Sequence, residues 1–365
     1  MGIPPEPILS VSVGLFTILA LVLILPFKFK VIEENLEAFF FLMGILAITI
    51  SNVWSYEIVK DALKAPISIG GLPIGIFQVV LIAGLTIYFF NKQIYKALFK
   101  LLNRLGFTFF TFIFVFVLGL ISSLISVIVT AVILAEIIAA LPLKREKKIE
   151  LTVLTCFSVG MGAALTPVGE PLSTIAVSNL RGPPYYAGFL FLFRMLGIYI
   201  IPGIFILALF TSYRMKKLKF GNINEIPEYT ETLRRVIIRA FRVYLFVAAL
   251  IFLGHGLSPL VFWYFSKVPP EVLYWINMIS AVLDNATLTA AEIGPALTYF
   301  QIKSALLALL ISGGILIPGN IPNIVAAGRL RISSKEWAKI GFPVGVTIML
   351  IYFIILLLER VCFGF

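Results

Sequence analysis

Two acidic residues, Glu170 and Asp284, interrupt long apolar segments of the sequence and are the first candidates for chemistry. A carboxylate inside a membrane is costly, so an acidic residue there is a functional candidate by default. Oxygen-bearing and small residues of the same or matching segments complete the candidate set: Thr166, Gly169, Ser173, Thr174, Ser280, Asn285, Thr287, Asn320, Asn323, Ser122, Ser123 and Ser126. Carboxylate, hydroxyl, amide and carbonyl oxygens can replace the hydration shell of a hard cation. Because Glu170 and Asp284 can bind either a proton or a cation, the set predicts an exchange site with these two acids as ligands of Na⁺.

Two proline-containing stretches, 166–171 and 317–322, surround the candidate residues, and neither can belong to a continuous helix. Each has two prolines four positions apart with a glycine between them, and proline removes a backbone donor and clashes with the preceding turn. Irregular backbone at membrane depth is tolerated only where it is buried in protein or lines a wet cavity. Breaks at matching places in two halves of a chain therefore point to the binding site of a transporter. The alternative is that Glu170 and Asp284 only cap half-helices.

The composition indicates a polytopic integral membrane protein with an all-α fold. Of the 365 residues, 60% are hydrophobic and 13% are charged, whereas a soluble domain has about 25% charged residues. The net charge of +11 is explained by basic cytoplasmic loops, so we expect the lipid bilayer and small cations as partners and no nucleic acid. The two cysteines lie in apolar segments, which excludes a disulfide framework and a cysteine-based metal site. With one histidine and no nucleophile–base set, we expect neither an enzyme nor a bound cofactor.

Apolar stretches of about 17 to 25 residues mark the expected membrane spans. We expect spans at 8–26, 38–54, 67–90, 187–211, 243–264 and 340–361, and broken spans at 150–178 and 302–328. The run 107–141 is too long for one crossing and short for two, and serines lie at its middle. It predicts a re-entrant hairpin, with an ordinary pair of helices as the alternative. A second hairpin is expected over 271–299, with an interruption at 284–287.

The expected elements form two halves of the same order. Span, hairpin, broken span and span fill 67–213 and again 243–365, with a cytoplasmic linker at 214–242 and two scaffold spans in 1–66. The stretch from Ile121 to Ser126 also resembles that from Ile279 to Asp284. If the amino terminus is outside and each hairpin returns to its own side, most basic residues fall inside, as the positive-inside rule asks. We therefore expect an inverted repeat in the cell membrane, with the amino terminus outside.

These features resemble the ion transporter superfamily, and most closely its NhaD-type sodium/proton antiporters. The stretch from Thr166 to Thr174 is similar to that family's proline, glycine and acidic motif followed by hydroxyl residues. A serine four residues before an Asp-Asn pair is similar to its second motif. The resemblance implies two re-entrant hairpins, two broken helices and a homodimer. It also implies cation binding and proton exchange at Glu170, Thr174, Ser280, Asp284 and Asn285.

The sequence thus predicts a secondary transporter that exchanges Na⁺ or Li⁺ for H⁺ by alternating access, with transported ions but no cofactor. The second reading is a sodium-coupled symporter of a small anion such as a dicarboxylate, citrate or an oxyanion, which the negative charge of Asp284 disfavours. The third is a passive channel, in which H⁺ and the cation would not compete. Four further charged residues lie in or near apolar segments and receive no role: Glu136, Glu292, Arg194 and Lys303.

Overall fold

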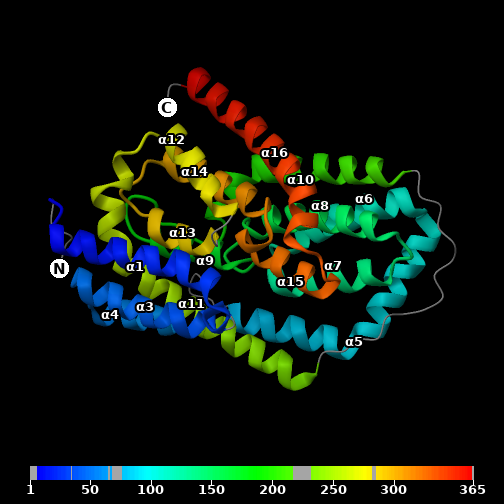
Figure 1. The fold of residues 1–365 in the computed structure, drawn as a ribbon, viewed down its shortest axis with the longest axis horizontal. Coiled ribbons are helices and arrows are strands. Elements are labelled where there is room, and N and C mark those ends of the chain that lie inside the picture. Colours follow the sequence, from blue (N-terminus) through cyan, green and yellow to red (C-terminus); the bar gives the residue numbers. More distant parts are fainter. Residues whose placement is uncertain are drawn as a thin grey trace.

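The computed structural model consists of helices over the residues it describes, which are 6–33, 35–64, 66–67, 76–216, 232–281 and 285–363. Within these ranges, α10 (Phe191–Met215) and α16 (Ser334–Phe363) are long and apolar enough to cross a membrane, and shorter apolar helices accompany them. Figure 1 shows α3, α11 and α5 along one side of the molecule and α10 and α16 along the other. This architecture agrees with the predicted all-α class and is compatible with a polytopic membrane protein.

The first helices form a layer against α11 (Leu233–Trp263). They are α1 (Leu9–Lys28), α2 (Lys30–Glu33), α3 (Leu36–Ser51) and α4 (Tyr56–Lys64). The backbones of α3 and α11 approach closely, because a Cβ added to Gly256 would lie 2.5 Å from the Cβ of Ala47. Small residues allow such close packing of apolar helices. The spans expected at 8–26 and 38–54 correspond to α1 and α3.

Two helices are longer than the sequence predicted. The span expected at 67–90 belongs to α5 (Ile76–Leu105), which continues through the basic stretch, and α11 starts within the expected linker 214–242. The mixed-charge stretch 56–64 is likewise helical. Lysine and arginine are good helix formers. The basic residues of α5 and α11 therefore indicate where the apolar part of each helix stops, and not where the helix ends. Residues 68–75 and 217–231 lie outside the described residues.

Short helices occupy both expected hairpins. In the first, α6 (Phe107–Ile121) and α7 (Val127–Ala140) meet at the predicted serines. In the second, α12 (Pro270–Ile276) and the 3-10 helix η2 (Asn277–Ala281) precede α13 (Asn285–Glu292). The expected interruption at 284–287 is therefore wrong for 285–287, which form the first turn of α13. A further 3-10 helix, η1 (Phe265–Lys267), precedes α12.

Both expected broken spans are interrupted. Helix α8 (Arg145–Ala163) stops before α9 (Pro171–Asn179) begins, and α14 (Tyr299–Gly313) is separated from α15 (Ile321–Leu330) by η3 (Ile317–Gly319). Each second half-helix has a proline in its first turn, Pro171 or Pro322. Proline is tolerated there because those backbone positions have no intrahelical acceptor.

The short and broken helices pack in a reciprocal pattern. Helix α6 lies on α8, and η2 and α12 lie on α14. The second arm of each hairpin also packs on the other half of the chain, α7 on α15 as well as on α8, and α13 on α9 as well as on α14. Figure 1 shows these elements between the two outer layers, so the chain breaks lie in the interior of the molecule.

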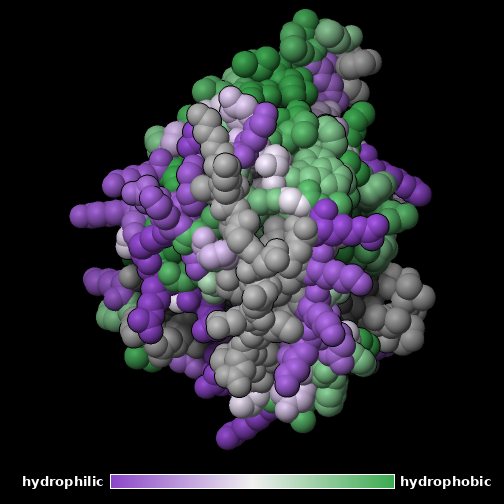
Figure 2. Space-filling view, turned by 90° about the vertical axis from the view of Figure 1, so that its right-hand side faces the viewer, coloured by the Kyte–Doolittle hydropathy of each residue, from purple (hydrophilic) through white to green (hydrophobic). Residues whose placement is uncertain are grey.

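Charged side chains gather at one end of the molecule. Figure 2 views the right-hand end of Figure 1 and shows hydrophilic residues around it, with hydrophobic ones towards α16. Helices α5 and α10 finish at this end with Arg104 and Arg214 in their last turns. Basic residues thus end both helices on this side of the molecule.

Candidate functional site

The first break places Glu170 at the start of α9. It is the N-cap residue in an extended conformation (φ −150°, ψ 162°), and its side chain is 2% exposed. The chain turns tightly before it, because a Cβ added to Gly169 would lie 2.0 Å from the carbonyl oxygen of Ala163. Glycine at 169 is thus needed to bring the cap of α9 back against the end of α8.

The first hairpin holds this break through hydroxyl and backbone groups. The Thr166 hydroxyl donates to the carbonyl of Ser123, and the amide of Val127 donates to the carbonyl of Gly169 at 2.7 Å. Ser122 Oγ lies 2.9 Å from the carbonyl oxygen of Val159 in α8. Ser126 caps α7 by accepting from the amide of Ile128 at 3.3 Å. The predicted serines and Thr166 therefore fix the position of the hairpin tip against the break.

The remaining predicted hydroxyls of this half support the bend in the chain. Ser173 Oγ donates to the carbonyl of Ala163 at 3.3 Å, and the Thr174 hydroxyl donates to the carbonyl of Pro167. Both acceptors belong to the end of α8 or to the break itself. These hydroxyls hold the two half-helices together, and each oxygen keeps a lone pair for a ligand.

The second break repeats the arrangement with amides in place of hydroxyls. Asn320 is the N-cap of α15 with φ −153° and ψ 147°, close to the backbone of Glu170. Asn323 Nδ2 donates to the carbonyls of Gly313 at 2.8 Å and Leu316 at 2.9 Å. Ser280 Oγ lies 3.5 Å from the carbonyl oxygen of Leu309, at the limit of a hydrogen bond.

Corresponding hydrogen bonds hold the two breaks in place. The bond from Ser173 to Ala163 corresponds to that from Asn323 to Gly313. The contact of Ser122 with Val159 corresponds to that of Ser280 with Leu309, so the two serines have equivalent positions in their hairpins. Glu170 then corresponds to Asn320, one residue away from the match that aligning the prolines of the two stretches gives. The correspondence between positions of the two breaks is therefore defined by their hydrogen bonds to backbone carbonyls, and not by the positions of their prolines.

The second break lies directly on α8 and on the second hairpin. A Cβ added to Gly160 would lie 2.6 Å from Asn320 Nδ2, and one added to Gly313 would lie 3.6 Å from Asn285 Nδ2. A Cβ on Gly319 would lie 2.5 Å from the carbonyl oxygen of Ser280. Three glycines thus leave room for amides and carbonyls from α8, α14, the break and the second hairpin to meet.

Polar atoms without partners collect at this meeting point. Asn285 Nδ2, Asn320 Oδ1 and Asn323 Oδ1 are buried and have no hydrogen-bond partner among the described residues. Buried polar atoms in proteins are almost always hydrogen-bonded, and an exception requires an explanation. A bound polar ligand or ion would supply the missing contacts. Asp284 and the side chain of Thr287, which the sequence also assigns to the site, lie outside the described residues.

Two of the four charged residues without an assigned role, Glu136 and Lys303, form ion pairs. Their partners are residues outside this set of four. Glu136 of α7 accepts from Arg329 of α15 through Nε at 2.6 Å and Nη2 at 3.0 Å. Lys303 is buried and pairs with Glu359, beside the hydroxyl of Tyr199. Arg194 is exposed.

The fourth, Glu292, is 3% exposed at the end of α13. Its carboxyl faces the side chain of Asn277, although neither amide atom of Asn277 meets the geometry of a hydrogen bond. Sequence reasoning missed Asn277, because an asparagine in an aromatic, apolar stretch carries no motif. Its burial could be found only from the packing of η2 on α14.

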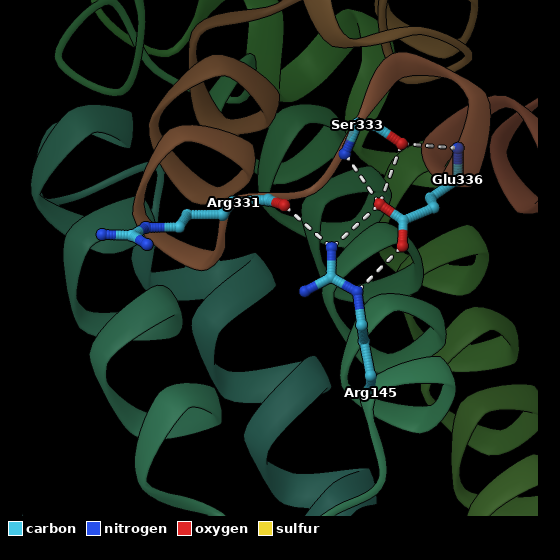
Figure 3. A network of polar contacts seen from close by, with 4 residues as sticks. All are labelled: Arg145, Arg331, Ser333 and Glu336. Atoms are coloured by element: carbon cyan, nitrogen blue, oxygen red, sulfur yellow. Dashed lines mark hydrogen bonds and ion pairs between the residues drawn. The ribbon is translucent and has the colours of Figure 1, made fainter.

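An ion-pair network joins three elements at the charged end of the molecule. Arg145 Nε and Nη2 each lie 2.9 Å from a carboxylate oxygen of Glu336, and Nη2 also donates to the carbonyl of Arg331 at 2.8 Å (Figure 3). Ser333 donates to the same carboxylate. Glu336 precedes the span expected from residue 340. The hydrogen bonds from Arg145 and Ser333 lower the pKa of Glu336 to about 2.

A protein-family model matches the sequence. The model of a family described as "Protein of unknown function (DUF1646)" matches residues 12–358, which is nearly the whole chain. No curated protein matches the sequence.

Proposed function

The chain belongs to this family of unknown function, and we propose that it is a secondary transporter that exchanges Na⁺ or Li⁺ for H⁺. The observation that carries the proposal is the pair of buried amide oxygens, Asn320 Oδ1 and Asn323 Oδ1, that lack partners among the described residues. They lie where a helix is interrupted, and hard cations prefer oxygen ligands of this kind. The buried Glu170 has the equivalent position in the first break, where its carboxylate would be a further oxygen ligand for a cation.

The fold proposed for this activity is an inverted repeat with two re-entrant hairpins. Helices α6 and α7 have 15 and 14 residues, or roughly 22 Å at 1.5 Å per residue, which is too short for a hydrocarbon core of about 30 Å. Helices α12 and α13 are shorter still. The equivalent serine contacts and break hydrogen bonds support a repeat, and the reciprocal packing of α7 on α15 and α13 on α9 supports its two-fold relation.

The proposed site uses the ends of the half-helices together with side chains. The amino termini of α9 and α15 carry partial positive charge, and the carboxyl ends of α8 and α14 present carbonyl oxygens with partial negative charge. Carbonyls, the amides of Asn320 and Asn323, and the carboxylates of Glu170 and Asp284 would surround the cation. When protons occupy the carboxylates, the cation loses its charged ligands, so protons and Na⁺ compete.

Alternating access would move the hairpins and broken helices against the layer of α1, α3 and α11. The extensive packing between α3 and α11 makes that layer a suitable scaffold. We propose that the protein works as a homodimer in the cell membrane with the amino terminus outside. The basic residues at one end of α5 and α10 support this orientation.

Sodium-coupled symport of a small anion is the second candidate, and one observation favours it. Asn285 Nδ2 is a buried donor without a partner among the described residues, and it lies close to the second break. A donor beside a helix amino terminus can receive an anionic oxygen. The carboxylate of Asp284 next to it in the sequence would oppose that anion, so exchange of cations remains the first proposal.

Proteoliposomes with an imposed pH gradient and an internal pH dye test the two candidates. Na⁺ or Li⁺ should dissipate the gradient, and K⁺ or choline should not. The Asp284→Asn and Glu170→Gln variants should lose this activity, whereas Glu57→Gln, a change of an exposed side chain, should keep it. If no cation moves protons in the unaltered protein, exchange is excluded, and sodium-dependent uptake of dicarboxylates and oxyanions would then support symport.

A further inference from the structure

The two hairpins each bury a glutamate near the end of their second arm, but among the described residues only Glu136 has a cationic partner. Glu136 in α7 accepts from Nε and Nη2 of Arg329 in α15. Arg329 lies at the same spacing from Asn320 as Asn179 does from Glu170. Where α15 carries an arginine, the equivalent position of α9 thus carries a neutral amide. Asn179 Nδ2 donates to the carbonyl of Ile293, directly after Glu292, at 3.0 Å.

Glu292 is thus buried, and it has no ion pair among the residues that the structure describes. Its Oε2 has no hydrogen-bond partner among the described residues, and the amide of Asn277, itself fully buried, is the polar group that faces the carboxyl. An ionised carboxylate in such a place is strongly unfavourable, and the group becomes neutral by binding a proton. The Asn277 side chain can donate to an ionised carboxylate or accept from a protonated one, so it can orient the carboxyl in both states.

The charged groups of the elements around α13 do not alter this conclusion. Helix α9 contains none, η2 contains none, and the one charged residue of α14, Lys303, is committed to Glu359. On α11, the arginines lie in its first turns, between Arg234 and Arg242, and Lys28 ends α1. His255 follows Gly254, whose added Cβ would touch Asn179, and is the nearest titratable group on α11.

Exposed residues lie close to Glu292 along the chain. Pro295 and Ala296, a few residues beyond it, are exposed. Asn285, which belongs to the proposed ion site, lies at the opposite end of α13 from Glu292. The length of this helix is roughly 10 Å at 1.5 Å per residue. At an effective dielectric constant of about 20, a cation at that distance changes the proton affinity of Glu292 about tenfold.

We propose that Glu292, oriented by Asn277, is a second proton-binding site, separate from the ion site and located between that site and the surface at 295–296. Its proton leaves to water when a cation occupies the ion site and returns when the cation leaves. The release and return of this proton with the cation rest on the proposed function. The protonated state of Glu292 in the absence of Na⁺ does not depend on that function.

Proton release on Na⁺ addition tests the exchange role. Purified protein in weakly buffered detergent solution receives Na⁺ while a pH dye counts the protons released. We expect Glu292→Gln to release fewer protons than the unaltered protein, by up to one per chain, while it still binds ²²Na⁺. Glu292→Asp should restore part of the release, and Glu57→Gln should leave it unchanged.

Infrared difference spectra of the same samples separate failure of this inference from failure of the proposed function. Without Na⁺, the unaltered protein should show the carbonyl stretch of protonated carboxyls at neutral pH, to which Glu170 and Asp284 also contribute. Glu292→Gln should lose the part of that band that comes from Glu292. A Glu292→Gln protein that keeps the full band, or that releases as many protons as the unaltered protein, overturns the proposal. Absence of any Na⁺-linked release in the unaltered protein, with the band present, overturns the exchange role alone.

Discussion

Glu170 and Asn320 cap the two half-helices that follow the chain breaks with nearly the same backbone conformation, φ −150° and ψ 162° against φ −153° and ψ 147°. The hydrogen bonds around them correspond at the same spacing. One break therefore presents a carboxylate where the other presents an amide. Of these two cap residues, only Glu170 can bind and release a proton, because an amide does not titrate at ordinary pH.

Asn320→Ala should weaken Na⁺ binding without unfolding the protein. The change removes a buried oxygen that has no partner among the described residues, so little folding energy is lost. Loss of one ligand worth about 1.4 kcal/mol raises the half-saturating Na⁺ concentration tenfold. The measurement is the Na⁺ dependence of dye response in proteoliposomes, with Asn91→Ala in α5 as the control. An unchanged half-saturating concentration would remove Asn320 from the site.

Gly160→Ala should abolish transport by crowding Asn320. The added Cβ would lie 2.6 Å from Asn320 Nδ2, whereas a Cβ on Gly328 in α15 meets nothing within 4 Å. Gly328→Ala is thus a matched control that should transport normally. Size-exclusion profiles and thermal melts of both variants report folding. Equal transport by the two variants would contradict close contact between α8 and the second break.

Ser122→Ala should destabilise the protein more than Ser280→Ala. Ser122 Oγ lies 2.9 Å from the Val159 carbonyl, while Ser280 Oγ lies 3.5 Å from that of Leu309. A buried hydrogen bond of ordinary length contributes about 1 kcal/mol, and a bond at the distance limit contributes less. Reversible unfolding in mixed detergent, followed by circular dichroism, gives the two free energies. The reverse order would show that the equivalent serines do not carry equivalent contacts.

Arg329→Gln should cost more stability than Glu136→Gln. Arg329 is 45% exposed in its side chain and can regain water when Glu136 is neutralised, whereas Glu136, at 8%, stays buried when the arginine is removed. Breaking a buried pair costs about 3–5 kcal/mol, and the exposure of Arg329 reduces this figure. A double-mutant cycle gives the coupling energy, and a value near zero would contradict the pairing.

Acid should loosen the contact between α8 and α16 through Glu336. Its pKa of about 2 in the folded protein lies below the ordinary 4.5, so the pair with Arg145 stabilises the fold above pH 4.5. That contribution decreases as the pH falls from 4.5 towards 2. Protease accessibility of the segment around Arg331 should rise over this window, and Glu336→Gln should show high accessibility already at neutral pH. A variant that matches the unaltered protein at pH 7 would contradict the clamp in Figure 3.

The sequence by itself determined the helical class, the two breaks and the helix turn at Ser122 to Ser126. The proline pairs 167/171 and 318/322, each with a glycine between them, prevent one continuous helix from running through either stretch, and the apolar composition requires helices in a membrane. These are local effects of backbone hydrogen bonding and solvation, so they can be predicted without knowing which segments meet. The predicted lengths of α5 and α11 were too short, because the prediction ended each span at the basic residues. A basic residue changes solvation but does not end a helix.

Only the tertiary structure decided which residues meet across the breaks. It moved the match between the two stretches by one residue, so that Glu170 corresponds to Asn320. It also separated Glu136, which has an arginine partner, from Glu292, which faces Asn277. Partners of this kind come from segments far apart in the chain, and their pairing depends on how glycines such as Gly160 and Gly313 let helices approach. A local sequence pattern does not indicate how closely two helices approach, because that distance depends on tertiary packing and not on helix propensity.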